Sequence, residues 1–73
     1  MKKIRYCIDG VNEDFPSLRA AKLHVSIAYT PEERLRELKG TSIVGYKNDK
    51  LYSNTFIIVD KSGSYAFGIT KKF

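Results

Sequence analysis

The stretch that decides the fold is LYSNTFIIVD, residues 51–60, and above all its apolar run Phe56-Ile57-Ile58-Val59. Consecutive residues of an extended strand point alternately to its two faces. A strand with one wet face would alternate apolar and polar residues, so this run predicts a central strand covered on both faces.

Turn sequences on both sides of this strand predict an antiparallel meander. Residues 42–47 alternate as a strand, and Asn48-Asp49-Lys50 forms the turn that joins them to the central strand. On the other side, residues 60–63 match a turn that ends in a left-handed glycine, followed by a strand over residues 64–70. The predicted meander therefore has three strands.

The N-terminal part of the chain predicts one more strand. Residues 2–9 alternate as a half-buried strand that Asp9-Gly10 ends, whereas residues 11–14 carry little pattern and are expected to form a loop. The pattern allows this strand to lie beside either the second or the fourth strand of the sheet.

A first helix is predicted after the loop. Ser17 is placed to cap it, and Leu18, Ala21, Val25 and Ala28 recur at three- and four-residue spacing as one apolar stripe. This stripe predicts a helix with one face in the core and the other toward water or a partner.

A second, short helix is predicted from the capping sequence at residues 30–33, TPEE, in which a Thr cap is followed by Pro and by Glu three positions later. Gly40 ends this helix in the left-handed conformation. Only Leu35 and Leu38 give it an apolar edge, so its charged residues, Arg34 among them, are expected to be largely solvated.

The order strand, helix, short helix and three strands predicts a single small α+β domain over residues 1–73. Its helices pack on one face of a mainly antiparallel sheet. Gly45 and Gly68 fall inside strands, where glycine weakens packing. They indicate a bulge, an aromatic ring lying across the sheet, or the close approach of another chain.

Composition excludes several classes of protein. With 42% hydrophobic and 29% charged residues, the chain is globular in type, and no apolar run approaches the roughly 18–20 residues that cross a bilayer. Arg5 and Asp9 interrupt what would be the apolar middle of a signal peptide. We therefore expect a cytoplasmic protein that has no membrane partner.

Catalytic and metal sites are not predicted. Cys7 and His24 are the only soft ligands, whereas a structural zinc site needs four, and we expect no cofactor. A Cys–His pair would need contact between a strand and a helix, and a free Cys is commonly a buried packing residue. The spacing of Asp9 and Asp14 specifies no acid–base geometry. We expect a protein that is not an enzyme.

Basic and aromatic residues favour nucleic acid as the partner. The net charge is +5, and Lys and Tyr interleave along the predicted strands. Phosphates attract Lys and Arg, and exposed aromatic rings stack on unpaired bases. The candidate nucleic-acid-binding residues are Arg19, Lys22, Tyr46, Lys47, Lys50, Tyr52, Lys71 and Lys72.

These residues also have purely structural uses, because Tyr is common in strands and Lys protects sheet edges from aggregation. The favoured hypothesis is a small basic accessory module, not catalytic, that binds nucleic acid. The alternative is a protein–protein interaction module or small homodimer that uses an edge strand. The first hypothesis requires its lysines to share one surface.

Overall fold

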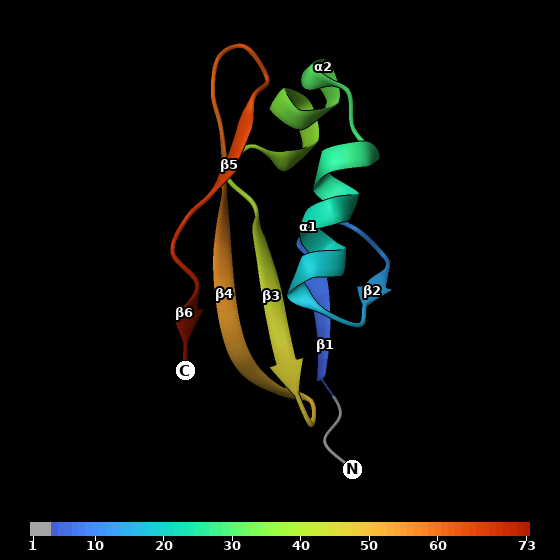
Figure 1. Cartoon of the computed structure of the whole chain (residues 1–73), viewed down its shortest axis with the longest axis vertical. Helices are drawn as coiled ribbons and strands as arrows, with labels where there is room; N and C mark the ends of the chain where they lie inside the picture. Colours follow the sequence, from blue (N-terminus) through green and yellow to red (C-terminus); the bar gives the residue numbers. More distant parts are fainter. Residues whose placement is uncertain (1–3) are drawn as a thin grey trace.

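The longest strand of the sheet is the predicted central strand. A computed structural model of the chain describes residues 4–73, in which β4 (Lys50–Val59) pairs antiparallel with β3 (Ser42–Lys47) (Figure 1). Asn48 and Asp49, between the two strands, have φ angles of 52° and 64°. Two consecutive positive φ angles are typical of the tight hairpin turn, so the predicted turn is confirmed.

The N-terminal strand lies beside β3. β1 (Ile4–Ile8) pairs antiparallel with β3, and its outer edge pairs with a two-residue strand, β2 (Asp14–Phe15). Lys2 and Lys3 of the predicted strand lie outside the described residues. The predicted loop over residues 11–14 is wrong at Asp14, which begins β2. Phe15 enters the core with 7% of its surface exposed, and this draws the chain back along β1.

The last predicted strand is divided into two. β5 (Tyr65–Phe67) and β6 (Lys71–Lys72) both pair with the same edge of β4. Between them, the Gly68 N–H donates to the Phe56 carbonyl at 2.8 Å, and the Thr55 and Thr70 hydroxyls are hydrogen-bonded at 2.8 Å. Residues 4–73 thus form six strands where four were predicted, with the order β2-β1-β3-β4-β5, and β6 pairs with β4 on the same edge as β5. The antiparallel α+β class is confirmed.

The helices begin at the predicted caps. In α1 (Leu18–Ile27), the Ser17 hydroxyl accepts from the Ala20 N–H at 3.1 Å. Ala21 and Val25 are fully buried, but Ala28 is exposed because the helix ends before it.

The second helix has two parts, α2 (Pro31–Glu33) and the π-helical turn η1 (Arg34–Leu38). The Thr30 N–H donates to the Glu33 carboxylate at 2.9 Å, which lowers the pKa of that carboxyl, and the Glu33 N–H donates back to the Thr30 hydroxyl at 3.2 Å. The predicted capping box is therefore confirmed. None of the helices formed by residues 4–73 is long and apolar enough to span a membrane.

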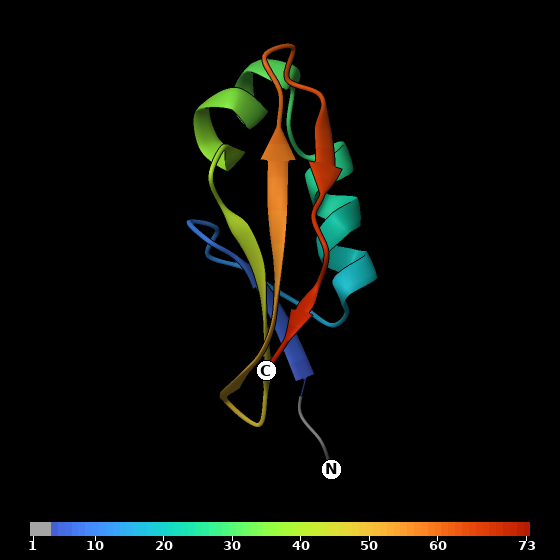
Figure 2. The same cartoon turned by 90° about the vertical axis from the view of Figure 1, so that its left-hand side faces the viewer.

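The helices lie on one side of the sheet, so its two faces differ (Figures 1 and 2). We call the face with Ile43, Thr55 and Ile57 the helix-side face and the face with Phe56 and Ile58 the open face. The core side chains are Ile8, Phe15, Ala21, Val25, Leu38, Ile43 and Ile57.

The prediction that the central strand is covered on both faces is wrong. Ile57 is fully buried, whereas Phe56 and Ile58 are 47% and 48% exposed. The helical segments are all on the helix-side face, and no other element of residues 4–73 covers the open face.

Gly45 is required by a close approach inside the sheet. The register shifts after Gly45, so that Tyr52 of β4 has no partner in β3, which is a bulge. A Cβ atom on Gly45 would lie against the Ser53 hydroxyl and 2.7 Å from the Tyr6 ring carbon Cε1. Both structural explanations predicted for this glycine, a bulge and a ring across the sheet, are present.

Candidate functional site

Strand alternation decides which of the predicted site residues share a face. Lys72 pairs with Ser53, whose hydroxyl lies over Gly45 on the helix side, and Lys47 follows Gly45 by two positions. Both lysines therefore lie on the helix-side face. Lys71 is the neighbour of Lys72 and points the opposite way.

A cluster of cations surrounds the ring of Tyr52 at one end of this face. The Nζ atoms of Lys47 and Lys72 lie 5.6 Å and 5.9 Å from the ring centroid, within the range of a cation–π interaction. Lys50 is directly opposite Lys47 in the hairpin and so shares its face. We call Lys47, Lys50, Tyr52 and Lys72 the Tyr52 cluster.

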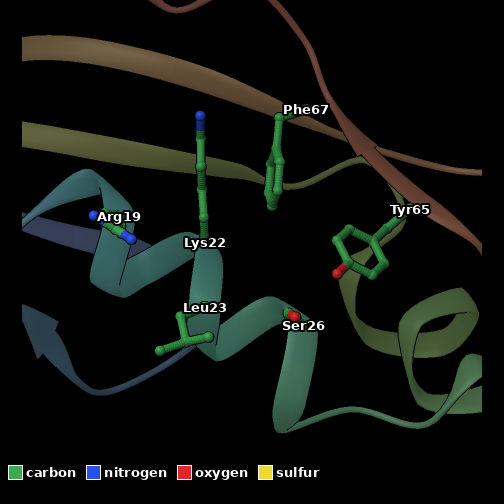
Figure 3. Close-up of a pocket in the computed structure, with 6 residues that line it drawn as sticks. All are labelled: Arg19, Lys22, Leu23, Ser26, Tyr65 and Phe67. Atoms are coloured by element: carbon green, nitrogen blue, oxygen red, sulfur yellow. The ribbon is translucent and has the colours of Figure 1, made fainter.

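The other two predicted site residues of this face, Arg19 and Lys22, lie on α1. With Leu23, Ser26, Tyr65 and Phe67 they line a groove of about 380 Å³ between α1 and β5 (Figure 3). Lys22 Nζ lies 5.2 Å from the centroid of the Phe67 ring, and the edge of Tyr65 meets Phe67 at a centroid distance of 5.7 Å. We call this the α1–β5 groove.

Arg34 joins the two walls of the groove at one end. Its guanidinium donates to the Gly63 carbonyl at 3.0 Å and to the Ser26 carbonyl at 3.5 Å, and its Cζ lies 4.6 Å from the Tyr65 ring centroid. The prediction that Arg34 is largely solvated is wrong. The turn before β5, 29 residues away in sequence, folds over it.

The groove and the Tyr52 cluster follow the same edge of the helix-side face. Phe67 pairs with Ile57 and Lys72 with Ser53, four residues apart on β4, which corresponds to about 13 Å at the rise of a strand. Sequence reasoning missed Tyr65 and Phe67 as site residues. Their alternation indicated a shared face but not that they would line a groove.

Tyr46 and Lys71 are on the open face. Tyr46 pairs with Arg5, whose guanidinium lies 4.5 Å from the ring centroid, and Lys71 pairs with Asn54. The structure thus brings six of the eight predicted residues to one face and separates these two from them. The requirement that Lys47, Lys50, Lys71 and Lys72 share one surface therefore fails for Lys71, because adjacent strand residues point to opposite faces.

Arg5, one of the cations of the open face, is close to carboxylates. Arg5 lies 3.5 Å from the Asp14 carboxylate and 3.7 Å from that of Asp49. The Cys7 thiol accepts from Arg5 at 3.2 Å and donates to Asp14 at 2.9 Å. Burial raises the pKa of the Cys7 thiol, and the hydrogen bond to Asp14 and the negative charge of Asp14 raise it further.

Cys7 and His24 do not form a pair. His24 packs between the rings of Phe15 and Tyr29, at centroid distances of 4.9 Å and 5.5 Å, while Cys7 bonds to open-face residues. Within residues 4–73, no group of three or more His, Cys, Asp or Glu side chains is arranged to hold a metal ion.

Comparisons of the chain with protein-family models, with curated proteins and with solved structures found no match. The function of the chain is therefore inferred from the side chains of the helix-side face and the open face.

Proposed function

We propose that this chain is a non-catalytic module that binds nucleic acid through its helix-side face. The observation that carries the proposal is the repeated placement of a cation against an aromatic ring on that face: Lys22 at Phe67, and Lys47 and Lys72 at Tyr52. Cations attract phosphates and rings stack on bases, so this pairing suits a nucleic acid strand.

The distribution of ion pairs supports the same face. Within the described part of the chain, Arg19, Lys22, Lys47 and Lys72 form no ion pair. On the open face, Arg5 lies near two carboxylates and Lys71 forms no ion pair with a described residue, so the contrast concerns the cations that lie beside aromatic rings. A cation without a carboxylate neighbour attracts phosphate more strongly, because no internal anion competes for it. The net charge of +5 adds a weak general attraction to polyanions.

The proposal is tested by amide chemical-shift changes on titration with short single- and double-stranded DNA and RNA, at about 50 and 200 mM salt. We expect shifts at residues 19–26, 47–53 and 65–72 that weaken as salt increases. Absence of shifts at low salt with every nucleic acid overturns the proposal.

Lys71 and Lys72 provide a matched pair of variants, since they are adjacent, exposed and on opposite faces. Lys72→Gln should weaken binding and reduce the slope of log affinity against log salt by about 0.7–0.9, as expected for one lost phosphate contact. Lys71→Gln should leave both unchanged. If the two variants weakened binding equally, nucleic acid would not bind through the helix-side face alone.

The alternative, an interaction module that adds a strand from another chain, has less support. The outer strands within residues 4–73 are β2, with two residues, and β5 and β6, with three and two. Such short edges offer few backbone groups for pairing. Sedimentation as a dimer at micromolar concentration, with no binding to nucleic acid, would favour this alternative.

A further inference from the structure

We propose that the nucleic acid bound by the helix-side face is single-stranded and that one of its unpaired bases enters the α1–β5 groove. This inference rests on the proposed function and specifies its ligand.

The position of the rings in the groove favours an unpaired base. Tyr65 and Phe67 form one side of the groove, and Leu23 and Ser26 of α1 form the other (Figure 3). Both rings are half-buried, because the helix rises beside them. A base that projects from its strand can reach such recessed rings, whereas a base inside a duplex is stacked on its neighbours and presents no free face.

Cations lie beside the groove, where the backbone of an inserted base would pass. Lys22 Nζ is 5.2 Å from the Phe67 ring centroid, and Arg19 precedes Lys22 by three positions, so both project from the same side of α1. Their charges suit the phosphates on either side of the inserted nucleotide. Apart from the two cations and the hydroxyls of Ser26 and Tyr65, the groove offers ring and aliphatic surface, so stacking rather than base identity should dominate.

The Tyr52 cluster supplies a second ring along the path of the strand. Its Lys72 lies about 13 Å from Phe67 along β4, and a flexible single strand can cover this distance and place another base against Tyr52. Lys47 and Lys72 are beside this ring for the adjoining phosphates. A stiff duplex cannot place bases against both rings at once.

The experiment compares three ligands of equal length by fluorescence anisotropy: a single-stranded oligodeoxythymidine, a duplex, and a single strand in which the bases are replaced by abasic sites. The abasic strand keeps the phosphate charges and removes stacking. Loss of stacking at one ring should weaken binding roughly 5- to 150-fold. We expect the intact single strand to bind more tightly than either of the other ligands.

Substitutions of single aromatic residues show which rings the bases stack on. Phe67→Leu and Tyr52→Leu should each weaken binding of the intact strand and leave that of the abasic strand unchanged, while Tyr46→Leu on the open face should affect neither. Thermal unfolding checks that each variant is folded. Tyr52→Leu tests stacking on the single strand even if Phe67→Leu fails to fold. Leu23→Lys, at a 57% exposed side chain that lines the groove, then tests entry of the base, because a long side chain there should obstruct the groove and weaken binding of the intact strand relative to the abasic strand.

The outcomes separate this inference from the proposed function. If no ligand binds, the proposed function itself fails. If the intact and abasic strands bind equally, or if the duplex binds as tightly as the single strand, the phosphate contacts remain and the single-strand inference is overturned.

Discussion

The two faces of one sheet carry similar residues in different surroundings. On the helix-side face Tyr52 lies beside Lys47 and Lys72, and on the open face Tyr46 lies beside Arg5. Arg5 is also near two carboxylates, while within residues 4–73 the two lysines form no ion pair. A cation next to an aromatic ring is therefore not enough to indicate a binding surface, because a neighbouring carboxylate reduces the attraction of that cation for phosphate.

Apolar residues show the same contrast. Ile57 and Ile58 are adjacent and of one type, yet the first is fully buried and the second 48% exposed. The difference arises because the helices pack on one face only. Three measurements test whether the two faces differ in this way.

The largest effect is expected from alanine substitution at this pair. Ile57→Ala removes fully buried methyl groups and should lower the free energy of unfolding by about 2–5 kcal/mol. Ile58→Ala should cost about 1 kcal/mol, because half of its side chain is already in water. Urea denaturation measures both. A cost at Ile58 as large as at Ile57 would mean that another chain covers the open face.

A smaller effect is expected at the strand glycines. Gly45→Ala would push a methyl group into Ser53 and the Tyr6 ring on the helix-side face and should cost about 1–3 kcal/mol. Gly68→Ala would place its methyl group at an ordinary contact distance of 3.5 Å from Phe56 Cβ, with an effect of about 1 kcal/mol or less. Thermal unfolding of both variants measures the two costs. A larger cost at Gly45 than at Gly68 would show that the sheet is packed more tightly at the glycine of the helix-side face.

The smallest effect concerns Cys7 on the open face. Burial and the bond to Asp14 raise its pKa above the ordinary value of 9.0, and the thiolate is the reactive form. Alkylation by iodoacetamide at pH 8 should therefore be slower in the folded chain than in urea, and its rate should level off at a higher pH in the folded chain than in urea. Asp14→Asn should speed the reaction, because it removes the negative charge that favours the neutral thiol.

Asp49→Asn is the control, since Asp49 contacts Arg5 and not the thiol. Saturating nucleic acid should leave the alkylation rate unchanged, because Cys7 is on the face opposite the proposed site. Protection of Cys7 would instead show that the open face takes part in binding.

Local sequence signals predicted the elements well where neighbouring residues alone decide the outcome. The caps at Ser17 and Thr30 are made by atoms three residues apart, and the hairpin turn at Asn48 and Asp49 depends on their own backbone angles. Predictions failed where distant segments meet. Local spacing predicts that Arg34 is solvated. In the fold, the turn before β5 brings the Gly63 carbonyl to its guanidinium, and spacing along the chain does not indicate this contact.

The alternation of the strands, the amphipathic face of α1 and the positive charge of the chain follow directly from the sequence, because each depends on residue type and spacing along the backbone. The tertiary structure is needed to show which face of the sheet is covered. It is also needed to show which cations contact an aromatic ring and have no carboxylate neighbour. The bulge at Tyr52, the division of the last strand into β5 and β6, and the packing of α1 against the sheet set these arrangements. Each arises from contacts between segments far apart in the chain, which compete for the same space and cannot be ranked from local spacing.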